Sequence, residues 1–233
     1  EVTKSTDLPA GITLVINTNA DMKVKNTATL TIKQGATFKG DGTVNVDGTV
    51  YAEEKGDVKS ALKIVADVKT EALDEKGKPA RTGWVMWTNV VDAIATADPN
   101  STVTITKDSG NVTLSKNLTI PDGVTLALPK DTAPLLLNNG VTLTIDGIVI
   151  VGSNIYAKQA FGLDAQNMKI EDGSGKASRY SSAVVVNGAL VSSDVVPYGN
   201  GSASSTQTKL ATAVALFGGK YVTGSYLTVN GNA

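Results

Sequence analysis

Two stretches of the chain share one layout of short apolar runs separated by glycine-containing breaks. Residues 131–157 read DTAPLLLNNGVTLTIDGIVIVGSNIYA, and residues 26–52 read NTATLTIKQGATFKGDGTVNVDGTVYA. At an offset of 105 residues and without a gap, matching residues coincide: Thr27 with Thr132, Gly35 with Gly140, Thr37 with Thr142, Asp41-Gly42 with Asp146-Gly147, and Tyr51-Ala52 with Tyr156-Ala157. The two copies of an internal repeat form the same kind of structural unit. We therefore interpret the chain as a duplicated β unit, residues 1–105 followed by residues 106–233.

The spacing of the turn signals favours a solenoid. The Thr- and Val-rich runs are roughly four or five residues long, the usual length of short strands, and the breaks between them are shorter still. Hairpin-based sandwiches space their turn signals by about 8–12 residues, whereas tighter spacing is typical of the flat faces and sharp corners of a coil. We predict an all-β parallel β-helix, with tandem β-sandwich domains as the alternative, because short strands alone do not fix parallel pairing. Aspartates that precede glycine are interpreted as turn residues, and they are Asp41, Asp47, Asp122, Asp146 and Asp172.

Two short helices are predicted to interrupt the strands. Thr88–Ala97 carries apolar residues at helical spacing, with Thr88 or Asn89 as the N-cap, and Lys209–Phe217 is interpreted as its counterpart in the second unit.

The charged stretch Lys69–Lys78 is predicted to be a solvated loop. Trp84 and Trp87, just before the first helix, are predicted to fill the core, as most aromatic side chains do.

The composition lowers the expectation of catalysis. The chain of 233 residues contains no His and no Cys, so it lacks the commonest general base and the commonest transition-metal ligand. We expect no enzyme activity, no catalytic residue and no cofactor. Calcium alone is left open, with the aspartates as its ligands. The net charge of −1 gives no electrostatic case for nucleic acid. No apolar run of about 20 residues is present, so no membrane span is expected.

The run Trp87–Leu128, WTNVVDAIATADPNSTVTITKDSGNVTLSKNLTIPDGVTLAL, resembles the lead-in of right-handed parallel β-helix proteins of microbial surfaces. In those proteins an Ala-rich helix precedes a Thr/Ile strand and a rung of the form LTIPxGVTL. The resemblance implies the β-helix fold and a pectate-lyase-like or adhesin-like relative at the cell surface. The clustered aspartates with a catalytic Arg or Lys that mark the lyases are not recognisable here.

These features lead to three functional hypotheses. The first is an extracellular, non-enzymatic structural subunit that assembles with itself, head to tail, into a filament, sheath or surface layer by β-strand pairing, because the repeat opens and closes in phase. The expected subunit contacts are Glu1, Val2, Leu8, Ile12, Leu14, Ile16, Tyr221, Val222, Tyr226, Leu227 and Val229. The alternative is an adhesin stalk or carbohydrate-binding module of a larger surface protein, with glycans or cell-wall material as partners. A polysaccharide lyase is the third.

Four Asn-x-Ser/Thr sequons mark candidate sites of N-glycosylation in a secreted chain. They lie at Asn100, Asn111, Asn117 and Asn200.

Overall fold

The structure, a computed structural model, confirms an all-β solenoid of stacked parallel strands. It describes residues 1–106, 112–129, 135–138, 140–152, 155–157, 183–192, 214–215 and 226–230. The chain divides into two compact units, Glu1–Thr96 and Ala97–Ala233. This division follows Thr96, whereas the sequence repeat places its boundary after residue 105. Among the described strands, no sheet contains members of both units.

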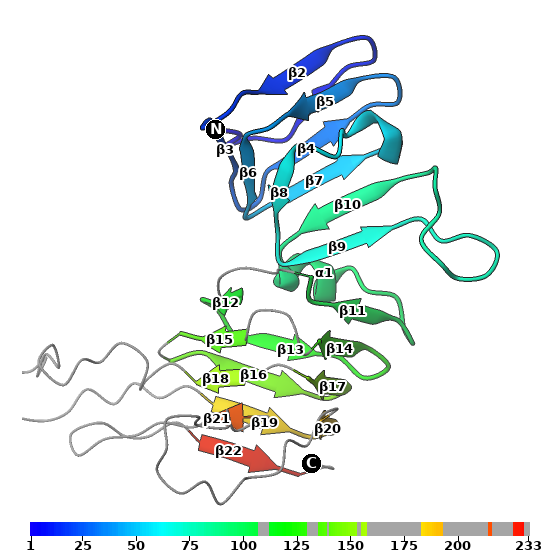
Figure 1. Ribbon diagram of the computed structural model, residues 1–233. Helices are drawn as coiled ribbons and strands as arrows, with labels where there is room; N and C mark the ends of the chain where they lie inside the picture. Colours follow the sequence, from blue (N-terminus) through cyan, green and yellow to red (C-terminus); the bar gives the residue numbers. More distant parts are fainter. Residues whose placement is uncertain are drawn as a thin grey trace, which may run out of the picture. The chain divides into compact units, whose positions relative to one another are not determined.

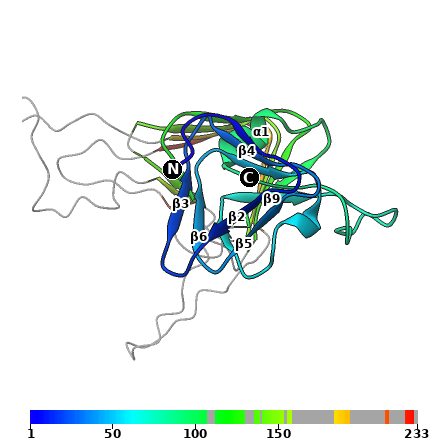
Figure 2. The same ribbon diagram turned by 90° about the horizontal axis from the view of Figure 1, so that it is seen from above.

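Unit 1 is a coil whose successive strands lie on successive faces (Figures 1 and 2). Each strand pairs in parallel with the strand one coil further along. Thr6 lies opposite Leu30 and Leu30 opposite Val50, so the coils are 30 − 6 = 24 and 50 − 30 = 20 residues long. The parallel strands of the three faces are β1 (Thr6–Leu8), β4 (Thr29–Ile32) and β7 (Thr49–Ala52); β2 (Thr13–Ile16) and β5 (Thr37–Gly40); and β3 (Asp21–Val24), β6 (Thr43–Val46) and β8 (Lys63–Val65).

The core of unit 1 is formed by alternate residues of these strands. In β4 the side chains of Leu30 and Ile32 are buried, whereas Thr29 and Thr31 lie at the surface and are only partly covered. The same alternation buries Phe38, Val44 and Val50, each of which is fully covered by neighbouring coils. The period of two in the sequence therefore places a row of apolar side chains on the inner side of each sheet.

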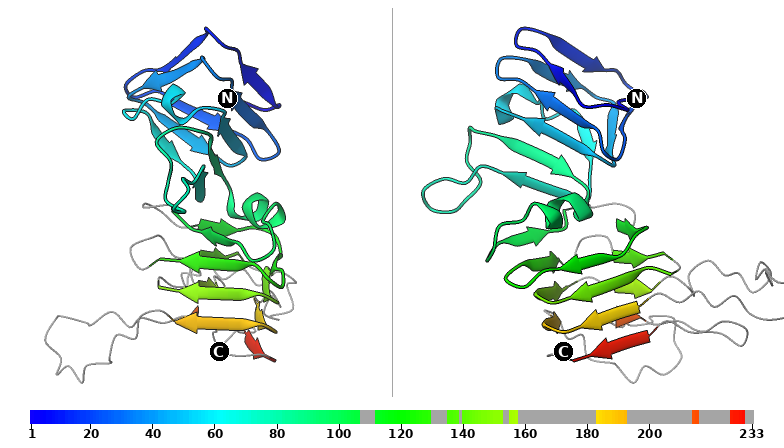
Figure 3. Two further views of the ribbon diagram at one scale, coloured as in Figure 1. Left: turned by 90° about the vertical axis from the view of Figure 1, so that its right-hand side faces the viewer. Right: turned by 180° about the vertical axis from the view of Figure 1, so that it is seen from behind.

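Unit 2 repeats the three-faced coil with four strands in each face (Figure 3). All described pairs are parallel. Val103 lies opposite Leu126 and Leu126 opposite Val149, 23 residues apart in each case, whereas Val149 lies opposite Leu190, 41 residues further on. The faces contain β11 (Thr102–Thr104), β14 (Thr125–Leu128), β17 (Ile148–Val151) and β20 (Ala189–Ser192); β12 (Val112–Leu114), β15 (Leu135–Leu137), β18 (Ile155–Ala157) and β21 (Val214–Ala215); and β13 (Leu118–Ile120), β16 (Thr142–Ile145), β19 (Ala183–Val186) and β22 (Tyr226–Val229).

The Asp-Gly corners make the same contact in both units. The backbone N–H groups of Asp41 and Gly42 both donate to the Ile16 carbonyl at 3.1 Å. Those of Asp146 and Gly147 both donate to the Ile120 carbonyl, at 2.9 and 3.0 Å. The aspartates at these two corners are therefore turn residues, as predicted, while Asp172 lies outside the described residues.

One end of unit 1 is closed by an antiparallel pair, β9 (Val68–Glu71) and β10 (Val85–Thr88) (Figure 1). Strand β10 pairs antiparallel with β7, and β9 forms the outer edge of the sheet. In this register Glu71 lies opposite the buried Val85, and Lys69 lies opposite Trp87, which packs against the core. Lys69 lies 3.5 Å from the Glu71 carboxylate, which also pairs with Lys55. Charged residues at inward positions protect a sheet edge against further strand addition.

Several local predictions need correction. The stretch Lys69–Lys78 is not wholly a loop, because its first residues belong to β9 and gain hydrogen bonds from β10. Trp84 does not fill the core: it is 39% exposed, and its ring lies 6.4 Å from that of Tyr51.

The helix predictions had mixed outcomes. Helix α1 (Val90–Ala95) forms as expected, and the Asn89 side chain caps it by accepting a bond from the Asp92 N–H at 2.9 Å. Within Lys209–Phe217 the described residues are Val214–Ala215, and they form strand β21 rather than a helix. The other residues of that stretch lie outside the described part.

The corner contact predicts a requirement for glycine at position 48. A Cβ atom there would lie 2.2 Å from the Lys25 carbonyl oxygen and 2.3 Å from that of Ala28, and both are backbone atoms. We expect Gly48→Ala to lower the free energy of unfolding by about 1–3 kcal/mol, the usual cost of overpacking. Urea denaturation followed by circular dichroism measures this. Gly56→Ala is the matched control, because a Cβ at Gly56 meets nothing within 4 Å; equal stability of the two variants would contradict the corner argument.

Candidate functional site

The first coil of unit 1 leaves apolar side chains uncovered. Within the described part of the chain, β1, β2 and β3 each pair on one side only, apart from a single bridge at Val2. Ile12 is 50% exposed and Leu14 is partly exposed. One coil inward, Ala36 is 1% exposed and Phe38, which lies opposite Leu14, is completely buried. The inward-facing residues of this sheet are therefore covered in the second coil, whereas Ile12 and Leu14 of the first coil are not.

The residues that precede β1 begin to cover one of the three edges. The Val2 N–H donates to the Lys23 carbonyl at 2.8 Å, and the Lys25 N–H donates to the Val2 carbonyl at 2.9 Å. Glu1 forms an exposed ion pair with Lys25 at 3.0 Å. Val2 thus occupies a parallel position over β3, whereas the edges of β1 and β2 have no such strand among the described residues.

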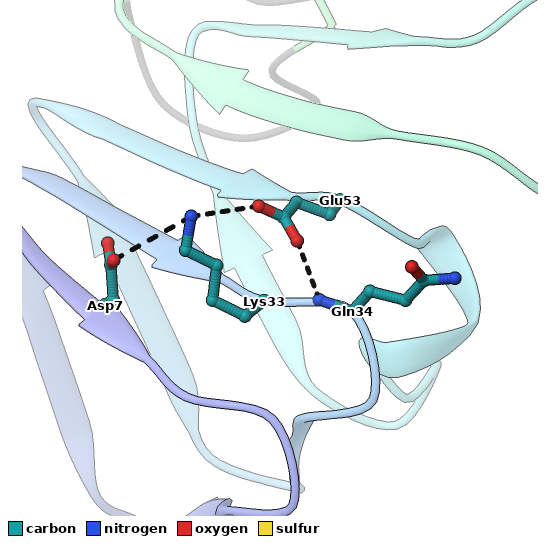
Figure 4. A network of polar contacts seen from close by, with 4 residues as sticks. All are labelled: Asp7, Lys33, Gln34 and Glu53. Carbon is teal, nitrogen blue, oxygen red and sulfur yellow. Dashed lines mark hydrogen bonds and ion pairs between the residues drawn. The ribbon is translucent and has the colours of Figure 1, made fainter.

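A ladder of polar contacts ties the first coil to the next two (Figure 4). The Lys33 ammonium lies 3.8 Å from the Asp7 carboxylate and 3.0 Å from that of Glu53, so it joins residues of three successive coils. The second Glu53 oxygen accepts the Gln34 backbone N–H at 2.9 Å. The Gln34 bond and then the Lys33 contact lower the pKa of Glu53, and the same contacts with Glu53 and Asp7 raise the pKa of Lys33.

The structure brings some of the predicted contact residues together in the first coil. Ile12 and Leu14 are accessible there, whereas Leu8 and Ile16 are buried at 8% exposure and serve the core of unit 1. Tyr226, Leu227 and Val229 lie on β22, which pairs on one side with β19. Tyr221 and Val222 lie outside the described residues.

Sequence reasoning missed the closed end of unit 1, with Lys69 and Glu71 at inward positions. Their alternation with the apolar residue Val68 was a weak signal, because a charged stretch usually lies in solvent.

Two of the four sequons fall on described residues. Asn100 and Asn117 are exposed, and the Asn117 side-chain oxygen accepts the Thr142 N–H at 2.9 Å. Asn111 and Asn200 lie outside the described part, so glycosylation stays a prediction at all four positions.

Unit 2 carries a shallow hollow of about 400 Å³ beside its Asp-Gly corners. Asp146 accepts a 2.7 Å hydrogen bond from the Asn187 side chain, and Asn230 in turn donates to Asn187 at 2.8 Å. The lining residues are Asn100, Asp122, Gly123, Thr125, Asp146, Gly147, Ile148, Gly188 and Ala189.

The described residues hold no group of three or more His, Cys, Asp or Glu side chains suited to a metal ion. Among them, no helix has the length and apolar character needed to cross a bilayer.

The described architecture defines the chain as a parallel β-solenoid protein with an internal repeat. No family model, curated protein or solved structure matches it. The predicted β-helix fold is confirmed, whereas the resemblance to proteins of microbial surfaces stays a prediction.

The ladder predicts a graded response of the Glu53 pKa. In Lys33→Met we expect this pKa to rise toward the ordinary glutamate value but to stay below it, because the Gln34 N–H still stabilises the carboxylate. Since the pKa of Glu53 is lowered in the folded state, the ionised carboxylate stabilises the fold fully above the unfolded-state pKa, and this stabilisation is lost as the pH falls through the folded-state pKa. NMR titration of the Glu53 carboxyl group measures the pKa in each variant. Lys23→Met, which removes the partner of Asp47, should leave Glu53 unchanged; an unchanged Glu53 pKa in Lys33→Met would contradict the ladder.

Proposed function

We propose that the protein is an extracellular structural subunit that assembles with itself, head to tail, into a filament, sheath or surface layer. The observation that carries the proposal is the open first coil, where Ile12 is exposed and Leu14 partly exposed while their neighbours one coil inward are buried. Exposed sheet edges with apolar side chains are templates for strand addition. The driving force is the burial of these side chains together with main-chain pairing along β1 and β2.

The difference between the two ends of unit 1 supports a directional assembly. At one end Lys69 and Glu71 occupy inward positions of the outer strand β9, and strand addition there would bury charges. At the other end the inward positions carry no charge: those of β2 are apolar, and those of β1 are Thr6 and Leu8. A contact between one open end and a different surface of the next copy is heterologous, and such contacts generate open polymers rather than closed dimers.

Placing a charge in the inward row of β2 tests this function. We expect Leu14→Lys to weaken self-association about 100-fold or more, because a stacked coil would bury an unpaired ammonium at a cost of several kcal/mol. Light scattering against concentration, with negative-stain electron microscopy, measures the association. Val15→Lys is the matched control, since Val15 is the next residue and faces outward at 45% exposure.

Circular dichroism must show that both variants keep the β spectrum of the native chain. A native protein that stays monomeric at millimolar concentration, or equal polymers from the two variants, would rule out the proposal.

The hollow in unit 2 favours a second candidate, a carbohydrate-binding module. Its Asp122 and Asp146 carboxylates can accept hydrogen bonds from sugar hydroxyls, and the Gly147 and Ile148 surface offers apolar contact.

The binding hypothesis predicts saturable NMR shifts at the hollow with cellotetraose or chitotetraose as the probe. In Asp122→Asn/Asp146→Asn we expect at least a tenfold weaker affinity, because the carboxylates are stronger acceptors than amides. Asp74→Asn, on the hairpin tip of unit 1, is the control. Unchanged spectra with both sugars would exclude these ligands.

A further inference from the structure

The repeat shows which strands of the two units occupy equivalent positions. At the offset of 105 residues, Thr37 at the start of β5 matches Thr142 at the start of β16. The sheet that contains β2 and β5 therefore corresponds to the sheet that contains β16, β19 and β22. The match of Tyr51-Ala52 with Tyr156-Ala157 likewise relates the sheet of β1 to the sheet of β21.

The register can be followed residue by residue from one open edge to the other. Leu14 lies opposite Phe38, and Phe38 matches Leu143 in the repeat. Leu143 lies opposite Val184, which lies opposite Leu227 of β22. Leu227 and Leu14 therefore hold the same position in equivalent strands, and Val229 corresponds to Ile16 in the same way.

We propose that the strand that covers β2 is β22 of a second copy, added in parallel with Leu227 over Leu14 and Val229 over Ile16. This inference rests on the proposed self-assembly and names the contact that produces it. Within the described residues β22 pairs only with β19, and no described strand lies along its other edge. In the order of the coil, the face after that of β22 is the face of β3, and there Val2 pairs with Val24. The first residues of one copy therefore occupy the face that comes after β22 of the other copy, so the order of the three faces continues from copy to copy.

The corner hydrogen bonds favour this pairing over the meeting of two first coils. At the corner that follows this face, an N–H donates to a carbonyl of the preceding coil: Gly42 to Ile16, Gly147 to Ile120 and Asn230 to Val186. At this corner a first coil thus presents donors, whereas a last coil presents acceptors. Head-to-tail stacking matches donors with acceptors, and head-to-head stacking would oppose donors with donors, which leaves them unpaired at a cost.

The side chains at the same corner also match. In unit 2 the amide of Asn230 donates to Asn187, and a second N–H of that amide is available for another acceptor. In unit 1 the Thr18 hydroxyl donates to Asp41 at 2.5 Å, and its oxygen retains lone pairs. Asp41 and Asp146 are repeat equivalents, and Val229 over Ile16 places Asn230 over Asn17, the residue before Thr18. Stacking of the two copies therefore brings the Asn187–Asn230 pair of one copy close to the Thr18–Asp41 pair of the other.

Site-directed cross-linking tests the register, because the chain has no cysteine of its own. Val15 and Thr228 hold equivalent positions next to Leu14 and Leu227, and adjacent strands lie about 4.8 Å apart. Val15→Cys and Thr228→Cys are made in separate copies, mixed, and treated with a short bis-maleimide. We expect covalent dimers in the mixture at a yield at least tenfold above that of either variant alone.

The control replaces Val15→Cys with Lys63→Cys, an exposed position on β8 in another sheet. Dimers from Val15→Cys alone would show head-to-head contact and overturn the register. If the native protein forms filaments but the mixture of Val15→Cys and Thr228→Cys cross-links no better than that of Lys63→Cys and Thr228→Cys, this inference is overturned and self-assembly is left intact. The absence of any native polymer would overturn both.

Discussion

Main-chain hydrogen bonding between successive coils is the constraint on which the rest of the structure depends. The strands of the coils pair in parallel with strands one coil away, and the Asp-Gly corners donate to carbonyls of the coil before them. The close approach leaves no room for a side chain at two of these corners. A Cβ at Gly48 would meet the Lys25 and Ala28 carbonyls of the preceding coil, and one at Gly147 would meet those of Pro121 and Val124. Because every coil needs a neighbour, a stack must be closed at its ends or be extended by another strand.

Unit 1 meets this need differently at its two ends. Strand β10 runs antiparallel to both β7 and β9, and this pair closes one end, where Lys69 and Glu71 balance one another's charge at inward positions. The first coil has no comparable charge among its inward residues, and Ile12 and Leu14 are left in contact with water. The cost of exposing such side chains, about 25 cal/mol per Å² of apolar surface, favours any strand that covers them.

The sequence predicted the features that depend on local chemistry and on the repeat. The Asp-Gly corners at Asp41 and Asp146 and the Asn89 cap follow from residue type, because turns and caps select side chains directly. The antiparallel pair at Lys69 was missed, since its pairing depends on a strand more than ten residues later and on burial that composition does not reveal. Val214 lies in an apolar run that suits a helix or a strand, and parallel pairing with β18 decides for the strand.

Charge stabilises contacts within the coils, whereas the proposed contact between copies is neutral. The ladder through Lys33 links coils of one chain and is exposed, so salt screens it. The residues that would meet across the copies are uncharged: Leu14 lies opposite Leu227, and Asn17 and Thr18 lie at the corner with Asn230. An interface of main-chain bonds, apolar side chains and amides gains little from ionic attraction, so its specificity must come from register. A shift by one residue along β2 would turn the apolar row outward, and this penalty selects a single alignment of the two strands.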